Sequence, residues 1–239
     1  MLMKKYIALI VLCTFVFVGF SQRDIPNNLP NFDKKVLHFG FSLGGGSNGF
    51  ALKPDLTKSD SLIKLEVLSQ PGFNINVVSE LHLGPYMGLR FTPGIAFSSR
   101  ILRYTFFEGN RVPDKIVDRT IESTYLDFPL LFKYRSKRVN NFASYVLVGG
   151  RYSLDLASQV GVDNQVDDKG EFIVKLGRNN YNIETGAGFD FFLEYFKFST
   201  EFKFCYGLNN VLIQDNTVYS RPITGLNSKI FMIAINFEG

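Results

Sequence analysis

Two consecutive stretches between residues 181 and 206 alternate apolar and polar side chains with a period of two. Side chains on a β-strand point alternately to opposite faces, so each stretch predicts a strand with one aromatic face and one charged or small face. Each is about 10 residues long, enough to cross a bilayer as a tilted strand. The two apolar faces comprise Tyr181, Ile183, Thr185, Ala187, Phe189, Phe191, Phe196, Phe198, Thr200, Phe202, Phe204 and Tyr206.

The same alternation recurs along the chain and predicts eight strands. These are expected around Leu37–Leu43, Phe73–Val77, Leu89–Ser98, Leu126–Tyr134, Val146–Leu156, Tyr181–Phe191, Phe196–Tyr206 and Phe231–Phe237. Long loops alternate with short turns between them. The loops are expected from Gly44 to about Leu65, from Phe107 to Arg119, from Ser158 to Arg178 and from Leu208 to Gly225. The tight turns are expected at Ser79–Glu80, Arg135–Asn141 and Leu193–Tyr195. An even number of strands with this loop pattern is typical of outer-membrane barrels.

A soluble lipocalin-like barrel also alternates, with its apolar side chains inside. Three features favour the membrane reading. Glycines share a face with charged residues, as small side chains must in a crowded eight-stranded interior; Phe and Tyr lie near the turns on the apolar face; and the last strand ends close to Phe237. The glycines of the charged face are Gly40, Gly88, Gly186 and Gly188. The predicted fold class is therefore all-β, an eight-stranded antiparallel up-and-down transmembrane barrel.

The first 21 residues resemble a secretory signal peptide. Lys4 and Lys5 precede an apolar run from Tyr6 to Phe20, and cleavage is expected before Gln22. A retained anchor helix is the alternative, but the run is short. Removal of residues 1–21 lowers the formal charge from +4 to +2, too little to indicate nucleic-acid binding. Cys205 is then the one cysteine left, so no internal disulfide is expected.

Residues 22–35 are polar and carry prolines, and we expect a periplasmic arm there, followed by the barrel over residues 36–239. The export signal without paired cysteines indicates the outer membrane of a Gram-negative bacterium. Inside the barrel, we expect five acidic and five basic residues to neutralise one another as a salt-bridge network. This set is Arg90, Asp127, Lys133, Arg151, Asp155, Glu184, Asp190, Lys197, Glu201 and Lys203. A proton or ion path would need a wider lumen than eight strands enclose.

Other patterns carry little chemistry. His38 and His82 are the two histidines, expected as an interior packing partner and a turn residue, so metal and general-base designs are disfavoured. Residues 163–171 depart from the spacing of a calcium loop and predict a solvated loop. Residues 44–46 lack the G-K-[ST] of a phosphate loop. No catalytic, cofactor or metal residues are predicted, and no small-molecule substrate.

The turn after the fourth strand is basic. Arg135, Lys137 and Arg138 are candidates for contact with a periplasmic partner or lipid phosphates, with a solvated turn as the default.

Three runs of the sequence resemble the PorT family of outer-membrane barrels. They are Asn31–Lys35 leading into Leu37–Phe41, Leu126–Arg138 (LDFPLLFKYRSKR) and Phe189–Ser199 (FDFFLEYFKFS). The resemblance covers essentially the whole chain after the signal peptide. It implies a non-enzymatic, accessory role in the type IX (Por) secretion system, with other components of that system as partners and a link to gliding motility in some bacteria. The alternatives are a generic small barrel with a structural or adhesive role and, as a different class, a lipid-modifying barrel enzyme.

Overall fold

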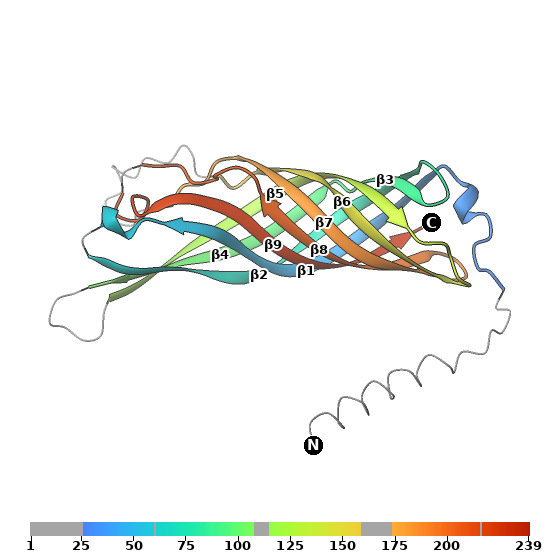
Figure 1. Cartoon of the computed structure of the whole chain (residues 1–239), viewed down its shortest axis with the longest axis horizontal. Helices are drawn as coiled ribbons and strands as arrows, with labels where there is room; N and C mark the ends of the chain where they lie inside the picture. The colour runs from blue at the N-terminus through green and yellow to red at the C-terminus, as the bar shows by residue number, and fades with distance from the viewer. Residues whose placement is uncertain (1–25, 60, 108–114, 159–173, 216) are drawn as a thin grey trace, which may run out of the picture.

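The computed structural model describes residues 26–59, 61–107, 115–158, 174–215 and 217–239, and these form an all-antiparallel sheet with two short 3-10 helices (Figure 1). The predicted signal peptide and residues 163–171 lie outside the described residues. The elements are η1 (Phe32–Lys34), β1 (Leu37–Pro54), η2 (Leu56–Lys58), β2 (Leu62–His82), β3 (Met87–Phe91), β4 (Gly94–Phe106), β5 (Lys115–Arg135), β6 (Phe142–Asp155), β7 (Asn179–Phe192), β8 (Lys197–Gly207) and β9 (Ile223–Glu238). No helix in the described part of the chain is long and apolar enough to span a membrane.

The sheet closes on itself because β1 pairs with both β2 and β9. All other strands that are neighbours in sequence pair antiparallel, except β3 with β4, and this connectivity is that of an up-and-down barrel. β3 and β4 occupy one place in the ring, since both lie between β2 and β5. The prediction of eight strands is therefore wrong by one: the third is interrupted at Thr92–Pro93, because Pro93 has no N–H to continue the ladder.

The register advances by ten residues in one circuit of the ring. Leu154 of β6 pairs with Leu126, and the pairing continues through β4, β2, β1, β9, β8 and β7 to Ser144, also on β6. Such a stagger requires strands that tilt relative to the barrel axis. The tilt is visible in Figure 1, where the termini of the described chain and η1 lie at one end of the barrel.

We call this end the turn end, because β2–β3, β5–β6 and β7–β8 are joined there by short connections. The opposite end is the loop end. Between the two, the predicted apolar faces point outward: Phe39, Ile75 and Val146 are each more than half exposed. The charged faces point inward and are buried. The predicted facing of the strands is confirmed.

Several predicted boundaries are wrong. The loops expected to end at Arg119 and at Gly225 end earlier, because β5 begins at Lys115 and β9 begins at Ile223. The glycine run at residues 44–49 does not open a loop, because β1 continues to Pro54 and β2 already begins at Leu62. The first tight turn does not lie at Ser79–Glu80, because β2 runs to His82. Glu80 is consequently an inner-face residue rather than a turn residue.

Above the closed ring, the strands separate into two groups. β1 pairs with β2 no further than Asn48 opposite Gln70, and β5 pairs with β6 no further than Tyr125 opposite Asp155. β2, β4 and β5 therefore extend as a three-stranded sheet, and Figure 1 shows it apart from the ends of β1 and β9. Inward side chains of both groups and two loop segments meet in an apolar cluster. This apolar cap comprises Phe50, Leu62, Leu65, Leu102, Tyr104, Ile121, Val174, Leu176, Val211, Leu212, Ile223 and Leu226.

Candidate functional site

Arg90 of β3 is the centre of the ion-pair network in the lower lumen. Its side chain is fully buried, and its guanidinium contacts Glu80 and Glu201. It also donates to Glu238, with 2.8 Å between Nη2 and Oε1. Three strands thus converge on one cation. A guanidinium suits this place because its fixed fork of five N–H donors can satisfy several carboxylates at once.

Two branches extend from the three carboxylates around Arg90. Lys133 Nζ lies 3.3 Å from Glu80 and 3.1 Å from Asp190, while Lys197 lies 2.8 Å from Glu238. Ser199 completes this layer by donating from Oγ to Asp190 at 2.5 Å. Every one of these side chains is buried, so the charges are compensated within the barrel rather than by solvent.

The other branch climbs toward the loop end. Lys203 joins Glu201 (2.9 Å) to Glu184 (3.5 Å). Arg151 then joins Glu184 (2.6 Å) to Asp127 (3.3 Å). Nine of the ten residues predicted for the lumen belong to this single connected network.

The tenth, Asp155, is buried at the top and accepts a hydrogen bond from the backbone N–H of Ala157 at 3.0 Å. Sequence reasoning missed three inner charges. Glu80 was assigned to a predicted turn at Ser79–Glu80 and therefore not to the inner face, although it keeps the period of two with the buried Val78. Glu238 follows the outward Phe237 and so falls inward by the same rule. Arg100 lies on the inner face of β4, between the rings of Phe50 and Tyr125 at 4.7 and 5.3 Å.

Glycines make room for these long side chains. A Cβ at Gly188 would lie 2.5 Å from the Tyr145 ring, whose hydroxyl donates to Glu201 at 2.7 Å. Gly44 likewise lies against the Asn74 amide, too close for a Cβ. The sharing of one face by glycine and charge therefore has a steric cause.

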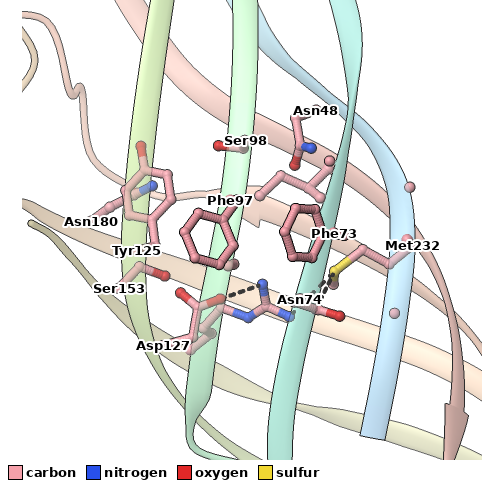
Figure 2. A pocket seen from close by; sticks show the side chains of 17 residues that line it. Asn48, Phe73, Asn74, Phe97, Ser98, Tyr125, Asp127, Ser153, Asn180 and Met232 are labelled. Atoms are coloured by element: carbon pink, nitrogen blue, oxygen red, sulfur yellow. Dashed lines mark hydrogen bonds and ion pairs between the residues drawn. The ribbon is translucent and has the colours of Figure 1, made fainter. Parts of the chain in front are cut away.

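A small cavity of about 20 Å³ lies above the network (Figure 2). Glycines of β1 and β2 form one wall, and the Asp127–Arg151 ion pair closes its lower side. Four buried atoms at its wall have no hydrogen-bond partner within the described protein: Asn74 Oδ1, Ser98 Oγ, Asp127 Oδ1 and Asn180 Oδ1. A volume of this size admits one or two waters and no larger solute.

The N-terminal arm closes the turn end. Phe32 of η1 is buried, stacks on His38 with 3.8 Å between ring centroids, and meets Phe192 edge-on at 5.8 Å. Lys197 Nζ lies 4.8 Å from the Phe32 ring, so the arm directly covers the bottom of the ion-pair network. His82, the last residue of β2, lies 4.5 Å from His38 ring to ring.

The basic turn holds this arm in place. Arg135 donates to Asp33 at 2.8 Å. Arg138 contacts the Asn28 carbonyl oxygen and lies 3.8 Å above the Phe192 ring. Burial lowers the pKa of Arg138, although Asp33 opposes the shift. Two of the three residues predicted to contact a partner are thus engaged by the chain's own arm; Lys137 is exposed.

A closed antiparallel barrel with an apolar outer belt and a charged inner face is the architecture of a transmembrane β-barrel. The sequence family described as "Outer membrane protein beta-barrel domain" matches residues 20–212, and the chain belongs to this family. The protein is accordingly an outer-membrane barrel.

The chain is similar to several solved outer-membrane proteins at low sequence identity. The outer membrane protein OprG from Pseudomonas aeruginosa is 13% identical with a TM-score of 0.45, and the match covers 85% of this chain and 94% of OprG. Neisserial surface protein A is 10% identical with a TM-score of 0.42, covering 83% and 95%. Ail, the attachment invasion locus protein of Yersinia pestis, is 12% identical with a TM-score of 0.37, covering 84% and 98%. No curated protein matches the sequence.

Proposed function

We propose that this barrel is a non-enzymatic, non-conducting component of type IX protein secretion. The observation that carries the proposal is that the lumen is closed at three levels. Phe32 and the arm cover the turn end, the Arg90 network fills the middle, and the apolar cap fills the loop end. With no path for a solute through the described structure, the barrel acts through its surfaces.

The type IX assignment rests on the resemblance of Leu126–Arg138 and Phe189–Ser199 to the PorT family. These runs build the turn end: Arg135 and Arg138 hold the arm, and Asp190 belongs to the bottom of the network. The segments that carry the resemblance thus form the surface directed toward the periplasm. In this proposal that surface, with the exposed Lys137, contacts other secretion components, either the translocon or its assembly factors.

A deletion strain tests the role in secretion. A reporter fused to a C-terminal sorting domain is followed in the medium and in the cells, with the intact chain supplied from a plasmid as the control. We expect the deletion to retain the reporter inside the cells and the plasmid to restore export. Normal export from the deletion strain would leave the alternative, a generic outer-membrane barrel with a structural or adhesive role.

Purification of a C-terminally tagged chain from solubilised outer membranes, followed by mass spectrometry, tests the partners. We expect other type IX components to co-purify, and to be lost with the double variant Arg135→Ser, Arg138→Ser. A matched variant, Arg103→Ser, changes an arginine at the opposite end and should leave co-purification intact. Recovery of the barrel alone would contradict a stable subunit.

Conductance across a planar bilayer tests the closed lumen separately. The purified chain is expected to insert without producing ion current above background. Steady current carried by the intact chain would overturn the non-conducting part of the proposal, whatever the secretion assay shows.

A further inference from the structure

The sheet formed by β2, β4 and β5 beyond the closed ring has an open edge on β5. Pairing with β6 ends at Tyr125 opposite Asp155, whereas β4 continues to pair with β5 up to Phe106 opposite Lys115. Residues 115–123 of β5 are therefore paired on one side only within the described structure. An unpaired strand edge is a template for another extended chain.

The hydrogen-bonding groups along this edge can be assigned from the last bond of the ladder. Leu156 N–H donates to the Thr124 carbonyl oxygen at 2.8 Å, so the backbone groups of Thr124 face the β6 side. Because these groups alternate along an antiparallel strand, those of Glu122 and Thr120 face the same side. No described residue bonds to the backbone of either. The edge thus offers two consecutive donor and acceptor pairs.

A groove runs beside these residues. It has a volume of about 180 Å³ and lies between Thr120–Ser123 on one side and Ser158, Val174 and Leu176 on the other. A second hollow of about 330 Å³ continues from it and shares Glu122, Ser123 and Ala157. The space beside the edge therefore accommodates the side chains of an added strand. Ile121 and Leu176 form the apolar floor of this space.

The acidic residues that line the groove favour a basic side chain on the segment that binds there. Glu122 is exposed and has no ion-pair partner among the described residues, and Asp155 lines the same groove. No lysine or arginine is among the lining residues. Ser123 also lies in the wall, with its hydroxyl beside the Asp155 carboxylate.

We propose that the β5 edge at Thr120–Thr124 is an extracellular docking site for an extended polypeptide segment with a lysine or arginine side chain, which adds as a strand. Main-chain hydrogen bonds to Thr120 and Glu122 supply the binding, and Glu122 selects the basic side chain. This inference does not depend on type IX secretion, because the purified barrel alone carries the site.

Binding of synthetic peptides to the purified full chain in detergent tests the site. The probe is a fluorescent octapeptide of alternating valine and threonine with one central lysine, followed by fluorescence anisotropy. Comparison peptides replace the lysine with glutamate or carry N-methyl groups on alternate residues. We expect saturable binding of the lysine peptide, weaker binding of the glutamate peptide, and roughly tenfold loss on N-methylation, which removes the donors of one edge.

Variants of the chain locate the binding. Thr120→Pro removes the edge-facing N–H and leaves the pairing with β4, a place where an edge strand tolerates proline. It should weaken binding of the lysine peptide roughly fivefold, since it removes one main-chain hydrogen bond and each such bond is worth about a factor of five. Thr120→Ala keeps the N–H and should bind as the unchanged chain does. Glu122→Gln should remove the preference for lysine over glutamate. Circular dichroism verifies that each variant is folded.

Two results would overturn the inference. If Thr120→Pro binds the peptide as tightly as Thr120→Ala, the edge is not the site. If the unchanged chain binds none of the peptides, the edge is already covered, by another segment of this chain or by a second copy that size-exclusion chromatography would reveal as a dimer.

Discussion

The lower lumen and the apolar cap are built from the same strands with opposite patterns. Along β5, the lower part directs Asp127 and Lys133 inward and Leu130 outward. The upper part directs Ile121 inward and Asp118 and Glu122 outward. The change occurs near Ser123–Thr124 without a break in the strand, so the backbone does not cause it. The difference reflects what surrounds the barrel: lipid below this level and water above it.

Each part satisfies its surroundings in a different way. In the bilayer, apolar side chains face the lipid, and the enclosed charges must compensate one another because they are buried away from bulk solvent. Above the bilayer, polar side chains such as Arg103 and Asp118 face water and pair across the surface at 2.6 Å. The interior there can be apolar, as in a soluble β-sandwich. The level at which the pattern reverses therefore marks where the barrel leaves the bilayer on the side of the loop end.

Loss of the central cation should affect the barrel most. Arg90→Met leaves Glu80, Glu201 and Glu238 without the guanidinium that they share. We expect the free energy of unfolding to fall by about 3–5 kcal/mol, because three buried carboxylates lose the cation that they share and keep only Lys133, Lys203 and Lys197 as ion-pair partners. Urea unfolding in detergent, followed by circular dichroism, measures it. Arg103→Met, in the exposed pair, should cost far less, because water already screens that pair. Equal losses would contradict the distinction between the two regions.

A truncation in the cap should have a smaller and local effect. Leu102 is fully buried there, and Leu102→Ala should lower local stability by about 2–3 kcal/mol through a cavity. Hydrogen exchange is expected to accelerate at residues 102–106 and not at residues 95–98 of the same strand. The matched variant Ile101→Ala changes the outer face and should leave the exchange rates of both segments as they are in the unchanged chain. Acceleration along all of β4 would show that cap and barrel unfold together.

Adding a methyl group inside the charged lumen should lower the free energy of unfolding by less than the two changes above. Gly188→Ala puts a Cβ against Tyr145 and should destabilise the barrel by about 1–3 kcal/mol through overpacking. Gly150 lies on the outer face, where a Cβ meets no atom closer than 3.9 Å. Gly150→Ala should stay within about 0.5 kcal/mol of the unchanged chain. The unfolding assay used for Arg90 compares both, and similar values would argue against a tightly packed lumen.

The arm should give the smallest change. Asp33→Asn removes the ion pair with Arg135, in which Asp33 is 38% exposed, and should cost between about 0 and 1 kcal/mol. The effect of this variant is best measured as faster tryptic cleavage after Lys34 or Lys35, because the arm would leave the turn end of the barrel more often. Phe32→Ala should accelerate cleavage further, since Phe32 is the buried anchor. Unchanged cleavage in both variants would show that the arm is held by other contacts.

Much of the barrel could be predicted from alternation alone. A period of two identifies the inner and outer faces of a strand whatever its partner, which is why Glu184, Asp190 and Phe189 were placed on the correct faces. The same rule failed where a local signal competed with it. The glycines at 44–46 suggest a loop, but they lie in β1 because the strand on either side keeps its pairing with β9. Glu80 was likewise missed as an inner-face residue, because a turn was predicted at Ser79–Glu80.

The sequence by itself determined that the chain forms alternating strands, which face of each strand points outward, and that the fold is an outer-membrane barrel, because these depend on local periodicity and on what each face must contact. Only the tertiary structure decided which charges meet, since Glu201 and Glu238 reach Arg90 from distant strands across the closed ring. It also decided that Arg135 and Arg138 bind the chain's own arm, and that β5 keeps an open edge. Contacts between residues more than a hundred positions apart follow from register and shear, and no local pattern encodes them.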